Sequence, residues 1–140
     1  MSELRFDTGL VNYKVNGVCD IAFNPTDTGF AEKIYAAFET LEKKQQEYNA
    51  EMNRIRGTAE IFDFARRIDL EMREMIDGVF GPVCDKIFGQ MNVYAMANGL
   101  PVWCNFMMAI IEVINETAEK EKKAMNPRVK KYMDKYGNRK

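Results

Sequence analysis

The sequence predicts a mainly α-helical fold of the α+β kind: a bundle of three to five helices, including a helical hairpin, with a small antiparallel β-hairpin at about residues 4–24. Two long segments carry apolar residues at alternating spacings of three and four, which is the helical period. An Asn-Gly dipeptide between two alternating stretches indicates the β-hairpin. No linker divides the 140 residues, so we expect one domain, residues 1–125, and a basic C-terminal tail, residues 126–140.

The predicted β-hairpin turns at Asn16-Gly17. A type I′ turn needs positive φ at both central residues, which Asn and Gly adopt readily. Apolar residues flank this dipeptide on both sides (Tyr13, Val15, Val18, Ile21 and Phe23). Residues 4–6 are expected to add a third short strand. Because a lone hairpin is marginal in water, it must pack on helices or join a sheet in an oligomer.

Two amphipathic helices are predicted next. Pro25 ends the second strand, and Thr26 or Asp27 supplies the N-cap of the first helix. This helix has a narrow apolar stripe in which Gln45 fills the one gap (Phe30, Ile34, Phe38, Leu41, Tyr48, Met52 and Ile55). Gly57 interrupts, and a second helix starting at Thr58 has its own stripe (Ile61, Ala65, Ile68, Met72, Met75 or Ile76, and Val79). The matching stripes predict an antiparallel helical hairpin, with an intermolecular coiled coil as the alternative.

The rest of the chain predicts shorter elements and one long helix. A short helix follows Gly81-Pro82 and ends at Gly89, and residues 90–99 predict another that ends at Asn98-Gly99. Pro101 suits the first turn of a final helix, about residues 101–124, which Asn126-Pro127 ends. Its apolar face is wide (102, 103, 106, 107, 110, 111, 113 and 114). That width predicts burial against two neighbours, or against one neighbour and another molecule.

The composition argues against an enzyme. Histidine is absent, which removes the Ser-His-Asp and Cys-His pairs and the imidazole metal ligand. The sequence contains neither the Rossmann nor the P-loop glycine motif. The carboxylates of the second helix (Glu60, Asp63, Asp69, Glu71, Glu74 and Asp77) alternate with arginines (Arg66, Arg67 and Arg73), the spacing of a solvated helix face. We expect no catalytic residue, no cofactor and no metal.

The cysteines and the apolar segments predict a location in the cytoplasm. Cys19, Cys84 and Cys104 are scattered without a CxxC spacing, as expected of thiols that pack in a reducing compartment. The first ten residues lack the regions of a signal peptide. The apolar run from Leu100 to Ile114 is shorter than the roughly 20 residues of a membrane span.

The charge is divided unevenly along the chain. Residues 119–140 contain nine Lys or Arg against three acidic residues, and the preceding 118 contain eleven against eighteen. A basic tail on an acidic body can increase solubility or dock on an acidic partner, or it can simply be a frayed, solvated terminus. Binding of nucleic acid is the less favoured alternative, because the body offers no complementary basic surface.

Methionines and aromatic residues gather between residues 91 and 114 (Met91, Tyr94, Met96, Trp103, Phe106, Met107 and Met108). An irregular core filled by methionine is the preferred interpretation, and an adaptable groove for a partner helix is the alternative. The candidate partner contacts are four residues of the final helix and four of the first helical stripe (Trp103, Phe106, Met107 and Ile110; Phe38, Leu41, Tyr48 and Met52).

Two stretches, VNGVCDIAFNPTDTGFAEKIYAAFETLEKK and MNVYAMANGLPVWCNFMMAIIEVI, carry a resemblance to a known group. The chain resembles the tail-assembly-chaperone-type proteins from the tail-gene cluster of long-tailed phages and prophages of Gram-positive bacteria. The similarity covers most of the chain and its motifs are structural. The resemblance implies a non-catalytic protein of the bacterial host cytoplasm. It would bind and solubilise the tape measure protein and help recruit the tail tube protein, and we expect it to form a homo-oligomer.

Two other functions fit the same sequence. One is a small structural tail or connector protein, which would be present in purified virions, whereas a chaperone would be absent. The other is a small regulator that binds nucleic acid through its basic tail, in which case binding would fall steeply with salt.

Overall fold

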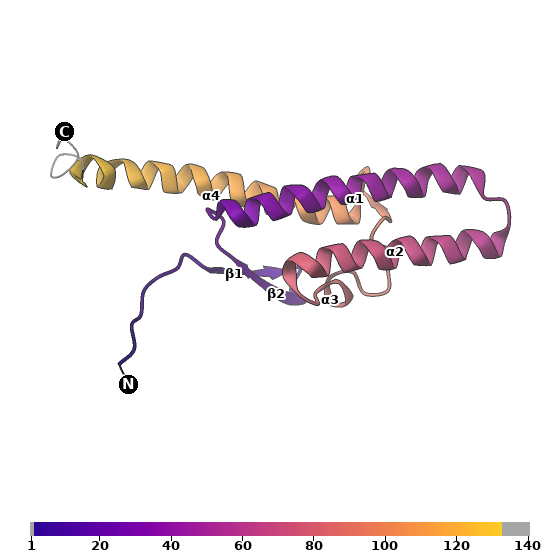
Figure 1. Ribbon diagram of the computed structural model, residues 1–140, viewed down its shortest axis with the longest axis horizontal. Coiled ribbons are helices and arrows are strands. Elements are labelled where there is room, and N and C mark those ends of the chain that lie inside the picture. Colours follow the sequence, from indigo (N-terminus) through magenta and orange to yellow (C-terminus); the bar gives the residue numbers. More distant parts are fainter. Residues whose placement is uncertain (1, 133–140) are drawn as a thin grey trace.

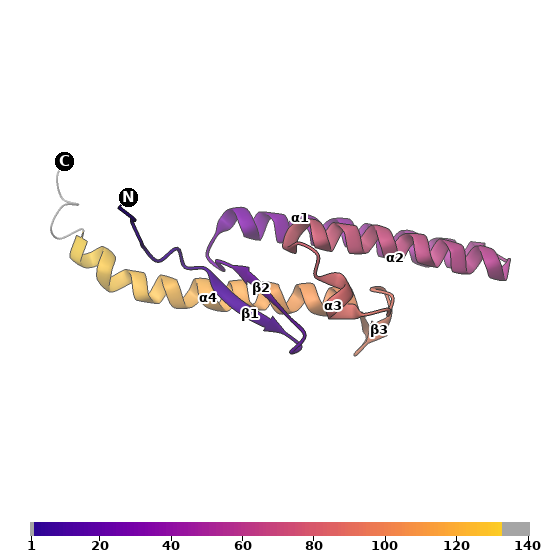
Figure 2. The same cartoon turned by 90° about the horizontal axis from the view of Figure 1, so that it is seen from below.

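The computed structural model describes residues 2–132, with side chains described for residues 2–121. These residues form four helices and a small N-terminal β-hairpin, which confirms the predicted fold class. Figures 1 and 2 show an elongated molecule in which α1 and α2 reach one end, and α4 reaches the opposite end. The β-hairpin and α3 lie beside the first part of α4 (Figure 2).

The β-hairpin consists of β1, Val11–Val15, and β2, Cys19–Phe23, in an antiparallel register. Asn16 and Gly17 form the turn with φ values of 48° and 72°, and the Val18 N–H donates to the Val15 carbonyl at 3.0 Å. The predicted turn is therefore confirmed. The third strand predicted at residues 4–6 was wrong: residues 2–10 form no strand and pair with no strand of the described chain.

The two central helices pack against each other in an antiparallel helical hairpin, which confirms the intramolecular arrangement. Helix α1 spans Thr28–Arg54 and α2 spans Thr58–Phe80. The Asp27 carboxylate caps α1 by accepting from the Gly29 N–H at 2.9 Å. Five side chains of the seam between the helices are fully buried (Ile34, Leu41, Ile68, Met72 and Ile76).

The connection from α2 to α4 differs from the prediction. The short helix α3, Cys84–Phe88, ends at Gly89 as expected. Residues 90–99 form no helix, so that prediction was wrong: β3, Met96–Ala97, pairs with β4, Leu100–Pro101, around a turn at Asn98-Gly99. The chain folds back because two amides beyond the turn donate to carbonyls before it, from Val102 to Ala95 and from Trp103 to Val93.

The final helix is longer than predicted. Helix α4 spans Val102–Tyr132 and continues through Asn126-Pro127. Pro127 removes one backbone N–H from the helical ladder, which a long helix accommodates by bending. Figure 2 shows α4 curving toward its C-terminal end. Residues 126–132 of the predicted tail therefore continue α4, and residues 133–140 lie outside the described residues.

Candidate functional site

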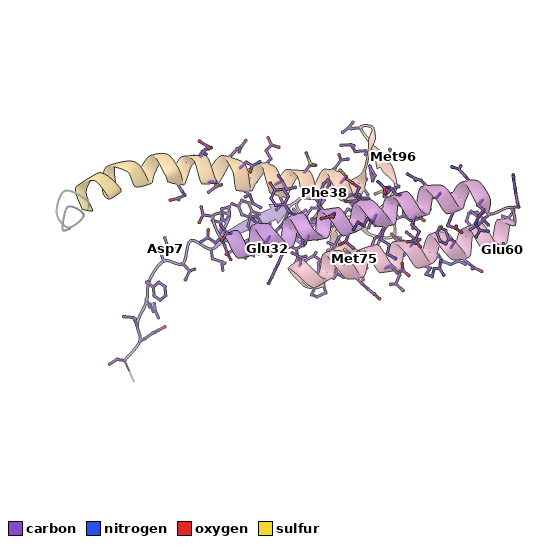
Figure 3. All side chains as sticks on the ribbon, turned by 45° about the horizontal axis from the view of Figure 1, so that its top comes forward. Asp7, Glu32, Phe38, Glu60, Met75 and Met96 are labelled. Carbon is purple, nitrogen blue, oxygen red and sulfur yellow. The ribbon has the colours of Figure 1, made fainter. Side chains whose placement is uncertain are left out.

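One side of α4 packs closely on α1. The Trp103 ring meets Phe38 edge-on, with 5.3 Å between ring centroids, and the Trp103 Nε1–H donates to Gln45 Oε1 at 3.0 Å. Figure 3 places Phe38 where α1 and α4 run side by side. Gln45, the one polar residue in the stripe of α1, therefore satisfies the buried indole. Met107 is fully buried on the same helix, so this side of α4 is closed.

The other side of α4 opens into a groove of about 480 Å³, a volume typical of a binding site. It is bounded by a floor and two walls. The floor is a face of α4 (Val102, Asn105, Phe106, Ala109, Ile110 and Val113). One wall is the β-hairpin (Tyr13, Lys14, Val15, Asn16, Ile21 and Phe23), and the other is α3 with the following loops (Ile87, Phe88, Met91 and Ala97). Lys14 is the one charged residue among the described side chains of this lining.

A chain of aromatic rings fixes the groove walls relative to one another. Phe23 of β2 stacks on Tyr13 at 4.7 Å and on Phe30 of α1 at 4.4 Å between centroids. On the floor, Phe106 meets Phe80 and Phe88 edge-on at 5.4 and 6.0 Å. These offset and edge contacts are the preferred arrangements of aromatic side chains. The groove is therefore preformed by packing between elements far apart in sequence.

Arg73 holds the wall that contains Met91. Its guanidinium is largely buried, and it pairs with Asp69 at 3.0 Å and with Asp85 at 2.9 Å. It also donates to the carbonyls of Gly89 and Met91, each at 2.7 Å. The second Asp69 oxygen accepts from the Val93 N–H at 2.7 Å. We call this set the Arg73 clasp. Guanidinium suits this role because its donors form a planar fork.

The prediction of a solvated carboxylate face on α2 was wrong for part of that helix. The side chains of Arg73 and Asp69 are only 11% and 16% exposed. Asp77 bonds across the Gly81-Pro82 break, where its Oδ1 accepts from the N–H groups of Val83 and Cys84 at 3.1 and 3.0 Å. In contrast, the Arg66–Asp63 pair is exposed as expected. Three of the nine charged residues of this face, Asp69, Arg73 and Asp77, therefore position α3 and the groove wall.

The two buried cysteines, Cys84 and Cys104, are poor nucleophiles. Burial raises the pKa of the Cys84 thiol, with a further contribution from Asp77, and burial likewise raises the pKa of Cys104. A raised pKa keeps a thiol protonated and unreactive. Among residues 2–121, no three His, Cys, Asp or Glu side chains are grouped to hold a metal ion. The arrangement is suited to apolar contact.

The predicted partner contacts occupy different positions in the fold. Phe106 and Ile110 line the groove although both are largely buried beneath it. Trp103, Met107 and Leu41 lie within the core. Phe38, Tyr48 and Met52 are half-buried and pack against that core along α1. The structure thus brings two of the eight to the groove, and partner binding by the eight stays a prediction.

Several groove residues were missed from sequence. Tyr13, Val15, Ile21 and Phe23 were assigned to the hairpin, but nothing local showed which element they would cover. Ala109 was not included in the predicted apolar face of the final helix, yet its small exposed side chain lies on the groove floor. The spacing of 102, 106, 110 and 113 was the one available signal, since it predicted an apolar face wider than one neighbour needs.

The chain finds no match among protein families, curated proteins or solved structures. Within the part of the chain that the structure describes, none of the helices has the length and apolar character needed to cross a membrane.

Proposed function

We propose that this protein is a non-catalytic chaperone that shields apolar, amphipathic helical segments of a partner during phage tail assembly. The partner is the tape measure protein, as the resemblance implies, and recruitment of the tail tube protein follows binding. The observation that carries the proposal is the preformed apolar groove between the β-hairpin, α3 and α4.

The floor of the groove supports a helical partner. Its six residues on α4 recur at spacings of three, one, three, one and three, which keeps them on one face of the helix. They extend over twelve residues, and the eleven steps from the first to the last span about 16 Å at 1.5 Å per step. An amphipathic helix presents its own apolar residues with the same period, so it can lie along such a face.

The polar groups of the groove support a tolerant mode of binding. Lys14, Asn16 and Asn105 are the polar residues of the lining, and they lie among thirteen lining residues without a charge or amide on the side chain. The Asn105 amide is already engaged, because its Nδ2 donates to the Ala97 carbonyl at 2.9 Å. Contact in the groove is therefore mostly apolar. This suits a chaperone that must cover many segments of one long partner.

Co-expression with the tape measure protein from the same tail-gene cluster tests the proposal. We expect the soluble fraction of the tape measure protein to rise with the native chain. Ala109→Glu places a carboxylate on the groove floor, and we expect it to abolish that rise. Ala50→Glu is the matched control, because Ala50 is an exposed residue of α1 outside the groove.

Three outcomes would contradict the proposal. The first is a tape measure protein that stays equally insoluble with and without the native chain. The second is an Ala109→Glu variant that remains folded by circular dichroism and solubilises as well as the native protein. The third is the presence of the protein in fixed copies in purified virions, which would favour a structural tail component.

A further inference from the structure

The first residues of the chain form an apolar arm without a core to cover them. In this N-terminal arm, residues 2–10, the side chains of Leu4, Phe6 and Leu10 are 88%, 76% and 64% exposed. Large apolar side chains clustered in so short a segment usually mark an interaction site. Figure 1 shows the arm running away from the helices and the β-hairpin.

A local contact directs the arm away from its own groove. Asn24, which follows β2, donates from Nδ2 to the Thr8 carbonyl at 2.8 Å, and the Gly9 N–H donates to Asp7 Oδ1 at 2.8 Å. Gly9 has a φ of +75°, and a Cβ there would lie 2.6 Å from Asn24 Nδ2. This contact requires glycine and fixes the end of β1 that lies opposite the Asn16-Gly17 turn. Residues 2–7 therefore leave the hairpin pointing outward (Figure 3, Asp7).

We infer that the N-terminal arm of a second copy of this chain occupies the groove in the free protein. The arm supplies Leu4 and Phe6 to the apolar floor at Phe106, Ala109 and Ile110. The charges are complementary, because the arm carries two acidic residues and one basic residue and Lys14 lies in the groove lining. The dimensions also match, since residues 2–7 reach about 20 Å when extended.

The position of the arm favours a reciprocal exchange. The arm leads directly into β1, and β1 is itself part of the groove wall. In the proposed dimer a two-fold axis relates the copies, so that each arm enters the groove of the other, and such self-complementary pairs are the commonest oligomers. The inference rests on the proposed function for its use: an apolar segment of the partner would displace the arm and separate the copies.

The oligomeric state of the full-length protein alone tests this inference. By analytical ultracentrifugation we expect the native chain to be dimeric. We expect Leu4→Asp with Phe6→Asp to raise the dimer dissociation constant by about 100-fold or more, because both apolar anchors are lost. Ala109→Glu blocks the groove from the other side and is expected to act similarly. The control is Phe62→Asp with Leu70→Asp, since both residues are 58% exposed on α2 and lie outside the groove.

Mixing the variants makes the test specific. The arm variant keeps an intact groove and the Ala109→Glu variant keeps an intact arm, so a mixture is expected to form a heterodimer through one of the two contacts. Four outcomes would each overturn the inference. The native chain could prove monomeric, or its oligomer could be insensitive to the arm substitutions. The mixture of variants could stay monomeric, or the α2 control could lose the dimer. Because no partner is present, these outcomes are independent of the co-expression result. A monomeric arm variant that still solubilises the tape measure protein would leave the proposed function intact.

Discussion

The two sides of α4 differ in what covers them. On one side Trp103 and Met107 are buried against α1, and the indole N–H is bonded to Gln45. On the other side Phe106 and Ile110 pack below a groove whose floor is completed by the exposed Ala109. The wide apolar face expected from sequence therefore divides into a closed half and an open half. The closed half fixes α4 on the helical hairpin, and the open half forms the floor of the groove.

The difference indicates how the fold separates stability from recognition. Apolar side chains on the closed half contribute their full burial to the free energy of unfolding. Val102 and Val113 border the groove and remain partly exposed, so they contribute less to stability and can gain further burial when a partner binds. Substitutions on the two halves of the same helix should consequently have different costs.

Truncating a side chain of the closed half should have the largest effect on the free energy of unfolding. Trp103→Ala removes a buried indole and its edge contact with Phe38, and we expect a loss of about 3–5 kcal/mol in the free energy of unfolding. Val113→Ala, on the groove side and half-buried, should cost only about 1 kcal/mol. Urea unfolding followed by circular dichroism measures both. Equal losses for the two variants would show that the open and closed halves do not differ.

Much of the fold was predictable because its signals are local. The Asn16-Gly17 turn, the Asp27 cap and the Gly57 break each act within a few residues, and all three occur as expected. The same kind of signal failed at Asn98-Gly99. That dipeptide suits both a helix end and a tight turn, and hydrogen bonds from the Val102 and Trp103 amides to the Ala95 and Val93 carbonyls select the turn.

The candidate site was less predictable because it depends on contacts between distant elements. The spacing between Asp69 and Arg73 is the same as that of an exposed ion pair, yet the pair is buried beneath the loop at Gly89. The β-hairpin is likewise held against α1 by the stacking of Phe23 on Phe30, two residues whose contact no local signal shows. Sequence periodicity shows that a face is apolar, but only the arrangement of the other elements shows which part of it stays open.

Removal of the Arg73 clasp should have an intermediate effect and should weaken the open side. Arg73→Met leaves Asp69 largely buried without its cation and frees the Gly89 and Met91 carbonyls, so we expect a loss of about 3 kcal/mol. Arg66→Met is the matched control, because its pair with Asp63 is exposed and should contribute less than about 1 kcal/mol. Urea unfolding measures both stabilities, and hydrogen exchange at Val93 reports the wall itself. Similar costs for the two arginines would mean that the clasp does not hold the groove wall.

The smallest effects on stability are expected from two Gly→Ala substitutions, one in the hairpin turn and one in α2, and these effects should have opposite signs. Gly17→Ala adds a methyl group to the hairpin turn at a residue with a φ of 72°. The methyl group meets open space, so the expected loss of stability of about 1 kcal/mol comes from backbone strain alone. Gly78→Ala lies in α2 with open space around it, and better helix propensity should stabilise the protein by about 0.5–1 kcal/mol. Thermal unfolding should therefore shift in opposite directions for the two variants. A stabilising Gly17→Ala would contradict the positive φ at the turn, and with it the register that presents Tyr13 and Val15 to the groove.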